Sequence, residues 1–542
     1  MKSGEQQSIT GHRRGLAVAL ATGWCVLSAC GGDGSTGDSC TDGAADDCAT
    51  TSLVAEAGHV SLDRTAYSLG NQQLEASASR FFYDFQPASA NVEQPPLLVV
   101  TGGGPAGAVA FLFAFCSGRN RVQERSDSEL SVAASPTPFT DFAHVLHIDA
   151  RNSGFSYAVL DDPNAEEDRA LQFSVDDYNA YRDAADVLRV LITFLQSHPT
   201  LLDGDLYFVS ESYGGVRTAV MLNLLLFADE YAAGARTLQD PDLSAAVEQL
   251  RQARFGGDRT EVTPDLWATF VRGQILMQPQ FGGARQTAIA AELLEQPGSV
   301  LYELAAAAGA TYVPCSQQSE SCDPYTNALD FLESLGHSPY DTRTTPDWLE
   351  RHLDQVAEAA THRAALALLL DLELGELDEV FSTPRPGAYR FSDPRFASMV
   401  TRGDLEAHYG TLAPWDAHFV DLNREALNAF VSRTTQAVGG DPAQTSYAEL
   451  FLQDLRYTDA FVTQAVHDLV IYSPAIAPTL ASYDEVLTVG EVADEALEVR
   501  YVDGDVGRLT MPRYPDSGHS VCRDQPAKLH DDIRDFIVRD RR

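Results

Sequence analysis

Residues 206–215 read Leu-Tyr-Phe-Val-Ser-Glu-Ser-Tyr-Gly-Gly, an apolar run that meets two glycines around a serine. The apolar run predicts a buried β-strand, and the residues from Gly214 to Leu226 predict the helix that follows it. Ser212 has a small residue two positions away on each side, Ser210 and Gly214. Small residues let neighbouring backbones approach in a tight turn, so the stretch predicts a strand–turn–helix elbow that presents the Ser212 hydroxyl. An ordinary strand–helix turn with a capping serine has the same pattern.

The segments around this elbow predict a mostly parallel sheet with helices on both faces. Strands, helices and turns alternate as crossover connections require. Residues 235–455 are rich in Ala, Leu and Glu and predict a large helical cap inserted between sheet segments at 53–234 and 456–542. The expected elements are a hairpin over 58–87, strands at Leu97–Val100, His144–Ile148, Leu206–Val209, Asp468–Tyr472, Glu498–Tyr501 and Leu509–Tyr514, and helices at 175–196, Gly214–Leu226 and Ala527–Val538.

The N-terminus resembles a lipoprotein export signal. Residues 1–29 combine early cations with an apolar run too short for a permanent membrane helix. The run ends in Leu-Ser-Ala-Cys, which is similar to a bacterial lipobox with Cys30 as the lipid attachment site. Residues 30–52 then predict a flexible tether. We therefore expect an exported protein of the bacterial cell envelope; a simple secretory signal cut nearby is the alternative.

Composition narrows the functional classes. The 542 residues carry a formal net charge of −40, which argues against nucleic-acid binding because phosphate contacts need clustered cations. Six cysteines remain once Cys25 and Cys30 are set aside, an even number compatible with disulfides. No spacing typical of a zinc site occurs, and no cofactor is expected. The expected pairs are Cys40–Cys48, Cys315–Cys322 and Cys116–Cys522.

Two further stretches supply groups that a nucleophilic serine needs, namely backbone donors and a base. Residues 102–105, Gly-Gly-Gly-Pro, follow a predicted strand and can expose backbone N–H groups to a substrate oxygen. His519 follows the last predicted strand, on a loop just before the final helix, where a base is needed to accept a serine proton. The serine, the glycine loop and the histidine occur in an order that predicts nucleophilic catalysis by Ser212.

Four motifs resemble the serine carboxypeptidase family. They are Glu-Ser-Tyr-Gly-Gly at 211–215, Gly-Gly-Pro at 103–105, Asp-Ala-Arg-Asn-Ser-Gly-Phe-Ser-Tyr at 149–157 and the histidine segment at 518–526. The resemblance implies an α/β-hydrolase fold with an interrupting cap, a peptide substrate and acyl transfer through Ser212 and His519. It also implies an oxyanion hole formed by the N–H groups of Gly104 and Tyr213, with Glu211 and Gly103 contacting substrate.

The chain also departs from this family in two places. The family's acid follows the strand expected at 468–472, which puts Ala477 at the acid's position and Asp484 as the nearest carboxylate downstream. The family's carboxylate-binding Asn is replaced by Gly102. A carboxypeptidase-like hydrolase is the leading hypothesis. An aminopeptidase or esterase of the same fold, which the Asp149-x-Arg151 pairing also allows, and a non-catalytic peptide-binding lipoprotein are the alternatives.

Overall fold

The computed structural model divides the chain into two units, residues 1–52 and 53–542. The residues that it describes lie in the second unit, and the predicted signal, the predicted tether, Cys30 and the predicted Cys40–Cys48 pair lie outside them. The described residues are 53–103, 108–126, 129–159, 161, 175–177, 179–257, 262–281, 292–307, 309–318, 322, 327, 331, 367–380, 447–465, 468, 471, 473–482, 487–492, 496–501, 507–515 and 517–540.

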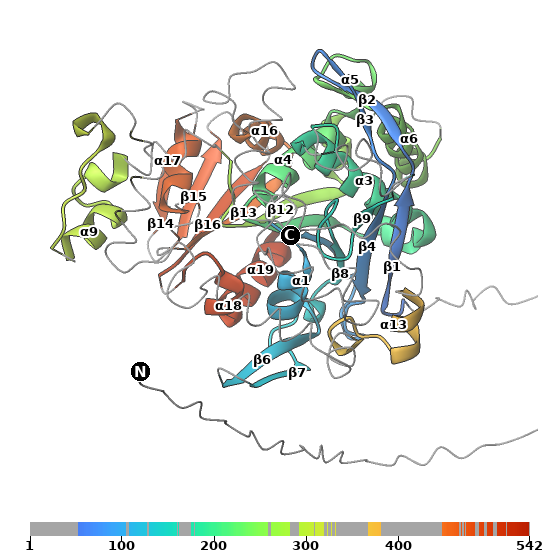
Figure 1. The fold of residues 1–542 in the computed structure, drawn as a ribbon, viewed down its shortest axis with the longest axis horizontal. Coiled ribbons are helices and arrows are strands. Elements are labelled where there is room, and N and C mark those ends of the chain that lie inside the picture. Colours follow the sequence, from blue (N-terminus) through green and yellow to red (C-terminus); the bar gives the residue numbers. More distant parts are fainter. Residues whose placement is uncertain are drawn as a thin grey trace, which may run out of the picture. The chain divides into compact units, whose positions relative to one another are not determined.

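A large mixed sheet forms the centre of the described region (Figure 1). Its strand order is β1-β4-β8-β5-β10-β12-β13-β16-β15-β14, and β9 pairs with β4. The bounds in that order are Glu56–Leu62, Ser79–Gln86, His144–Ile148, Leu97–Thr101, Leu206–Glu211, Val271–Met277, Asp459–Ala465, Arg508–Tyr514, Ala496–Tyr501 and Leu487–Val492, with β9 at Tyr157–Ala158.

The middle of this sheet is parallel and its two ends are antiparallel. Strands β8, β5, β10, β12, β13 and β16 pair in parallel, whereas β1, β4, β14 and β15 pair antiparallel with their neighbours. Every residue of β5 and β10 is buried, as expected for strands covered on both faces. The predicted mostly parallel sheet is confirmed. In such sheets, sites form beyond the carboxyl ends of the parallel strands.

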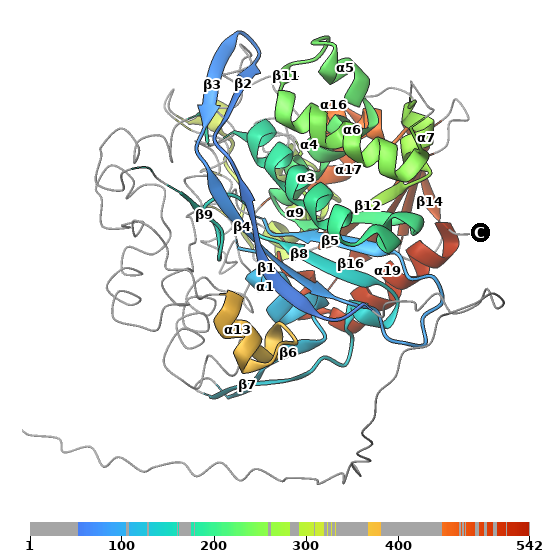
Figure 2. The same ribbon diagram turned by 90° about the vertical axis from the view of Figure 1, so that its right-hand side faces the viewer.

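Helices cover both faces of the sheet (Figure 2). On one face lie α3 (Ala180–Ser197), α4 (Gly214–Leu226) and α6 (Pro241–Phe255), while α19 (Pro526–Asp540) lies on the other. Helix α18 (Val521–Asp524) packs next to α19. The ring of Phe536 in α19 packs against Tyr207 of β10 and Phe461 of β13, with centroids 6.3 and 5.5 Å apart. The strand order and these helices give the α/β-hydrolase arrangement predicted from the sequence.

Smaller elements extend from this frame. The hairpin predicted over 58–87 is present, but each of its arms is divided into two strands. Strand β1 pairs with β4, while β2 (Thr65–Leu69) and β3 (Gln72–Ala76) form the tip that turns at Gly70. Strand β11 (Leu238–Gln239) pairs with β2. Strands β6 (Asn120–Ser126) and β7 (Glu129–Ala134) form a separate ribbon. The other helices are α1 Ala110–Leu112, α5 Ala228–Ala232, α7 Pro264–Ala268, α9 Val300–Ala307, α13 Leu374–Val380, α16 Ala448–Asp454, α17 Ile476–Ala481, η1 Phe113–Ser117, η2 Phe139–Asp141, η3 Pro199–Asp203, η4 Cys315–Gln317 and η7 Ser473–Ala475.

Two sequence predictions about strands were wrong. Strand β12 lies inside the range 235–455 that was predicted as a helical cap, yet it pairs in the middle of the sheet between β10 and β13. The strand predicted at 468–472 is instead β13, which ends at Ala465. Buried Phe461 and Val462 fill the sheet at β13, so Asp468 follows the strand rather than starting it.

The disulfides follow the predicted pairs where the structure describes them. Cys116 is bonded to Cys522, and Cys315 is bonded to Cys322. The first bond joins η1 to α18 across 406 residues of sequence. Among the described helices, none has the length and apolar character needed to cross a membrane.

Candidate active site

Ser212 stands in a strained turn between β10 and α4. Its φ of +57° lies in the left-handed region, which non-glycine residues rarely adopt and which costs roughly 1–2 kcal/mol. The turn is fixed from both sides, because the Ser212 N–H donates to the Met277 carbonyl at 2.9 Å and the Ser212 carbonyl accepts from Gln280 N–H at 2.9 Å. The sequence therefore folds here as the predicted elbow, with strain at the residue predicted to be the nucleophile.

The two glycines after Ser212 are needed for close packing. A Cβ on Gly214 would come within 2.5 Å of the Ser210 Cβ, and one on Gly215 within 2.5 Å of the Pro279 Cβ. Real Cβ atoms do not approach this closely, so larger residues would push the helix away from the strand. The tight elbow thus depends on the small residues seen in the sequence.

The glycine loop after β5 lies against this elbow. A Cβ on Gly103 would lie 3.0 Å from the Glu211 carbonyl oxygen and 3.1 Å from the Ser212 Cβ. Backbone from the loop therefore approaches the serine closely. Gly104, the predicted oxyanion donor, falls outside the described residues, whereas Tyr213 is buried at the residue before α4, where helix N–H groups lack partners within the helix.

His519 is hydrogen-bonded to a buried acid that the sequence analysis missed. His519 Nδ1 lies 3.0 Å from Asp468 Oδ1, and the Asp468 side chain is fully buried. The hydroxyl of Ser473 donates to the other oxygen, Oδ2, at 2.5 Å. The prediction that Ala477 occupies the acid's position was wrong: Ala477 lies in α17, and Asp484 falls outside the described residues.

The histidine loop is held by its own carboxylate and by the long-range disulfide. Asp524 Oδ2 accepts hydrogen bonds from the Gly518 N–H at 2.9 Å and from the Ser517 hydroxyl at 3.2 Å. Cys522 is bonded to η1, and its sulfur lies 3.4 Å from the sulfur of Met277. Since the Met277 carbonyl accepts the Ser212 N–H, this contact connects the histidine loop to the elbow.

The charges that act on Glu211 indicate that the serine elbow and the histidine loop lie near each other. Burial raises the pKa of its carboxyl to about 7, the positive charge of His519 opposes the rise, and the charges of Asp468 and Asp524 add to it. Glu211 precedes Ser212 in the chain, so the elbow and the histidine loop lie close enough for their charges to interact. A carboxyl with this pKa is protonated in about half of the molecules near neutral pH.

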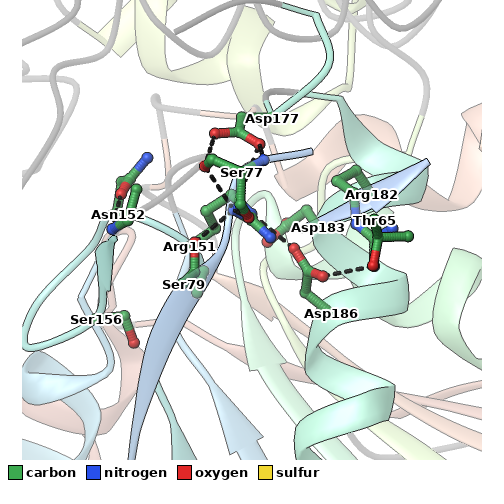
Figure 3. A network of polar contacts seen from close by, with 12 residues as sticks. Thr65, Ser77, Ser79, Arg151, Asn152, Ser156, Asp177, Arg182, Asp183 and Asp186 are labelled. Atoms are coloured by element: carbon green, nitrogen blue, oxygen red, sulfur yellow. Dashed lines mark hydrogen bonds and ion pairs between the residues drawn. The ribbon is translucent and has the colours of Figure 1, made fainter. Parts of the chain in front are cut away.

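Arg151, the basic residue of the Asp149-x-Arg151 pairing, belongs to a buried ion network instead (Figure 3). Its Nε donates to Asp186 Oδ2 at 2.7 Å, and its Nη1 lies 3.4 Å from Asp177 Oδ1. Asp149 accepts the N–H groups of Val109 and Phe155 at 2.7 and 2.8 Å. Both side chains are therefore engaged in holding loops together, which removes this pairing as support for an aminopeptidase.

A second Ser–His–Asp set lies inside the fold. His147 Nε2 is 2.8 Å from Ser117 Oγ, and His147 Nδ1 is 2.8 Å from Asp84 Oδ2. All three residues have no exposed surface, whereas 8% of Ser212 and 13% of the His519 side chain are exposed. Burial separates the two sets: Ser212 and His519 keep some exposed surface, whereas Ser117 has none. Among the described residues, no group of His, Cys, Asp and Glu could hold a metal ion.

One known family is similar to the part of the chain that contains Ser212. Residues 56–233 match the model of the serine carboxypeptidase family. Over these residues the chain is similar to that family. The serine carboxypeptidase-like region contains Ser212 and the glycine loop, whereas Asp468 and His519 lie beyond it.

Individual relatives are distant. The serine carboxypeptidase-like protein 17 of Arabidopsis thaliana is 26% identical over 145 residues, which cover 26% of this chain and 30% of that protein. The chain thus matches about a third of this relative's length. The prohormone-processing carboxypeptidase Kex1 of Saccharomyces cerevisiae aligns at 16% identity and a TM-score of 0.43, covering 90% of this chain and 91% of its own. A proline iminopeptidase-related protein of Thermus thermophilus aligns at 13% identity and a TM-score of 0.33, covering 90% and 98%.

Proposed function

We propose that this protein is a serine hydrolase that cleaves peptides through an acyl-enzyme, with carboxypeptidase action as its leading mode. The observation that carries the proposal is the buried hydrogen bond between Asp468 and His519, beside an elbow that holds Ser212 at positive φ. The hypothesis of a non-catalytic binding protein rested on the expected absence of an acid beside His519. Because Asp468 is present there, that hypothesis loses its support. The family match over residues 56–233 supports the same reaction class.

The proposed chemistry follows from the roles of the three side chains. Ser212 Oγ attacks the carbonyl carbon of the scissile bond while its proton passes to His519 Nε2, the ring nitrogen that faces away from Asp468. Asp468 fixes the tautomer and stabilises the imidazolium that forms. The imidazolium then protonates the leaving amine, and water releases the acid from Ser212 by the same steps. Backbone N–H groups of Gly104 and Tyr213 are the proposed donors to the oxyanion.

Glu211 is the proposed binding residue for a substrate carboxylate. Two carboxyl groups attract each other only when one of them is protonated and donates a hydrogen bond. The raised pKa of Glu211, about 7, keeps a protonated fraction available up to neutral pH. Because Gly102 offers no side-chain amide beside it, we expect carboxylate capture by this chain to depend on the protonated form of Glu211.

A covalent probe tests the reaction class. A fluorophosphonate should label the purified protein, the Ser212→Ala variant should not be labelled, and Ser117→Ala should keep the label because Ser117 is buried. Absence of labelling between about pH 5 and about pH 9, the range in which histidine bases operate, would refute a serine hydrolase.

A matched pair of peptides tests the carboxypeptidase mode. A peptide blocked at its N-terminus should be cleaved when its C-terminus is free and much more slowly when it is amidated. Equal rates would leave an esterase or another peptidase mode of the same fold. Cleavage only of a peptide with a free N-terminus would point to an aminopeptidase.

We further propose that the protein is exported and anchored to the bacterial cell envelope through lipid on Cys30. The short apolar run before the Leu-Ser-Ala-Cys sequence supports this, and two disulfides agree with an oxidising compartment. Labelled palmitate should be incorporated by the full chain and not by Cys30→Ser, with Cys25→Ser as the matched control. Equal incorporation in both variants would refute the anchor.

A further inference from the structure

Arg217 makes contacts that the catalytic chemistry described above does not use. It lies in the first turn of α4, and its side chain is fully buried. A buried guanidinium requires partners, because an isolated charge in the protein interior is costly. Arg217 Nε donates to Asp183 Oδ2 at 2.7 Å, and Arg217 Nη1 donates to the carbonyl oxygen of Gly102. The side chain therefore links helix α3, helix α4 and the glycine loop.

Gly102 is the first residue after β5, where the sheet no longer fixes the backbone. The last pair between β5 and β10 joins Thr101 to Ser210. The Gly102 carbonyl oxygen lies 3.5 Å from the position of a Cβ on Gly214, so it faces the start of α4. The peptide group between Gly102 and Gly103 is planar, and a partner that holds its oxygen also sets the direction of the Gly103 N–H. Arg217 thus orients the backbone that passes within contact distance of Ser212.

Asp183 also holds Tyr213, the second predicted donor of the oxyanion hole. The hydroxyl of Tyr213 donates to Asp183 Oδ2 at 3.2 Å, and the guanidinium of Arg217 stacks over the Tyr213 ring, 5.2 Å from its centroid. Tyr213 and Asp183 are both buried. One carboxylate oxygen therefore anchors Tyr213 directly and Gly102 through Arg217.

We propose that Asp183 and Arg217 are positioning residues that hold the two backbone segments of the oxyanion hole in register. Oxyanion stabilisation depends on donors that are already aimed when the negative charge develops. Displacement of a group by about 1 Å costs up to roughly 100-fold in rate. This pair, Asp183 and Arg217, is called the clamp below. It acts through Gly102 and Tyr213 and contacts neither substrate nor the reacting atoms. This inference rests on the proposed serine hydrolase function.

The chain offers a matched control for the loss of a buried ion pair. Arg182 on α3 is also fully buried, and it donates to Asp240 Oδ2 at 2.7 Å and to Asp186 Oδ1 at 2.5 Å. These two carboxylates differ from the partners of Arg217, which are Asp183 and the carbonyl of Gly102. Arg182→Met therefore removes a buried cation of the same kind without touching the clamp.

The test compares Arg217→Met and Arg217→Lys with Arg182→Met on the blocked peptide with a free C-terminus, well below the lowest melting temperature. We expect Arg217→Met to lower kcat roughly 10- to 100-fold with KM changed less than about 3-fold, and Arg182→Met to keep kcat within about 3-fold. Arg217→Lys should lie between them, because one ammonium cannot bond Asp183 and Gly102 with the fixed fork of arginine. The proposal is overturned if Arg217→Met and Arg182→Met have the same kcat, or if only KM changes.

Hydrogen exchange gives a readout independent of turnover. Amide exchange in the peptide containing Gly102 and Gly103 should quicken in both Arg217 variants and stay at the wild-type rate in Arg182→Met. Unchanged exchange in the Arg217 variants would refute the clamp, and Arg217→Lys supplies this measurement if Arg217→Met does not fold. If the wild type cleaves no peptide and takes no fluorophosphonate label, the proposed function fails, while the exchange result still decides whether Arg217 holds the loop.

Discussion

Replacement of Asp468 by Asn removes one charge from the site and retains the shape of the side chain. In the wild type, the carboxylate accepts from His519 at 3.0 Å and from Ser473 at 2.5 Å. The Asn amide can instead donate to His519 Nδ1, which would put the imidazole proton on Nε2, where it blocks acceptance of the Ser212 proton. We therefore expect Asp468→Asn to fold and to lose most of its kcat.

The geometry sets the size of this loss. With charge centres about 4 Å apart and an effective dielectric constant of about 20, a carboxylate stabilises an imidazolium by about 4 kcal/mol. Since each 1.36 kcal/mol in the barrier is about tenfold in rate, the charge alone accounts for about 10³-fold. The wrong tautomer adds to this, so a total loss of roughly 10³- to 10⁴-fold in kcat is expected.

The buried Ser–His–Asp set provides the control. Asp84→Asn makes the same substitution in a second Asp–His pair, 2.8 Å apart, whose acid is as buried as Asp468 and lies outside the proposed site. We expect Asp84→Asn to lower the melting temperature and to keep kcat within about 3-fold in the folded fraction. Steady-state kinetics and the rate of fluorophosphonate labelling measure both variants. A kcat for Asp468→Asn within tenfold of wild type would refute the assignment of Asp468 as the acid.

Three other perturbations test the site. Ser212→Gly should have a free energy of unfolding about 1 kcal/mol higher than Ser212→Ala, because glycine adopts the positive φ without strain. Thermal melts measure the difference, and equal stability of the two variants would refute strain at the elbow. Because burial raises the pKa of Glu211 to about 7, the protonated carboxyl stabilises the fold below about pH 4.5 and this contribution is lost as pH rises through about 7. As pH rises between these limits, the free energy of unfolding of Glu211→Gln should increase relative to wild type by up to roughly 3 kcal/mol, measured by denaturant titration. In wild type only, KM for the peptide with a free C-terminus should rise above about pH 7. Cys116→Ala with Cys522→Ala should lose about 2–5 kcal/mol in stability and should lower kcat more than KM, since the bond holds the histidine loop; a fully active double variant would show that Asp524 alone suffices.

The first half of the site was predictable because its signals are local. The strand, the elbow and the helix at 206–226 follow one another without interruption, and the structure has helix α4 at Gly214–Leu226 as predicted. The small residues needed for close packing, including Gly103 and Gly214, are visible in the sequence itself. The loop histidine was recognisable by its place between the last strand and the last helix.

The acid was missed because its signal is not local. The apolar run after Asp468 resembles a strand more closely than β13 does, since β13 contains Thr463 and Gln464. What makes 459–465 a strand is its position between β12 and β16, which sequence periodicity does not report. Strand β12 was missed for the same reason: Gly273 and Gln274 interrupt its apolar pattern. Gly273 is there because a Cβ would come within 2.6 Å of the Asp459 carbonyl oxygen on β13.

The pairing of Cys116 with Cys522 affects how the chain is made as well as how it works. At about 5–20 residues per second, synthesis separates these two thiols by about 20–80 s across their 406 residues. Cys315 and Cys322 emerge during that interval and can capture Cys116 first. Correct maturation therefore requires the early thiol to stay reduced or a mispaired bond to be exchanged. A disulfide isomerase should accordingly raise the yield of active protein more than it raises the yield of total protein.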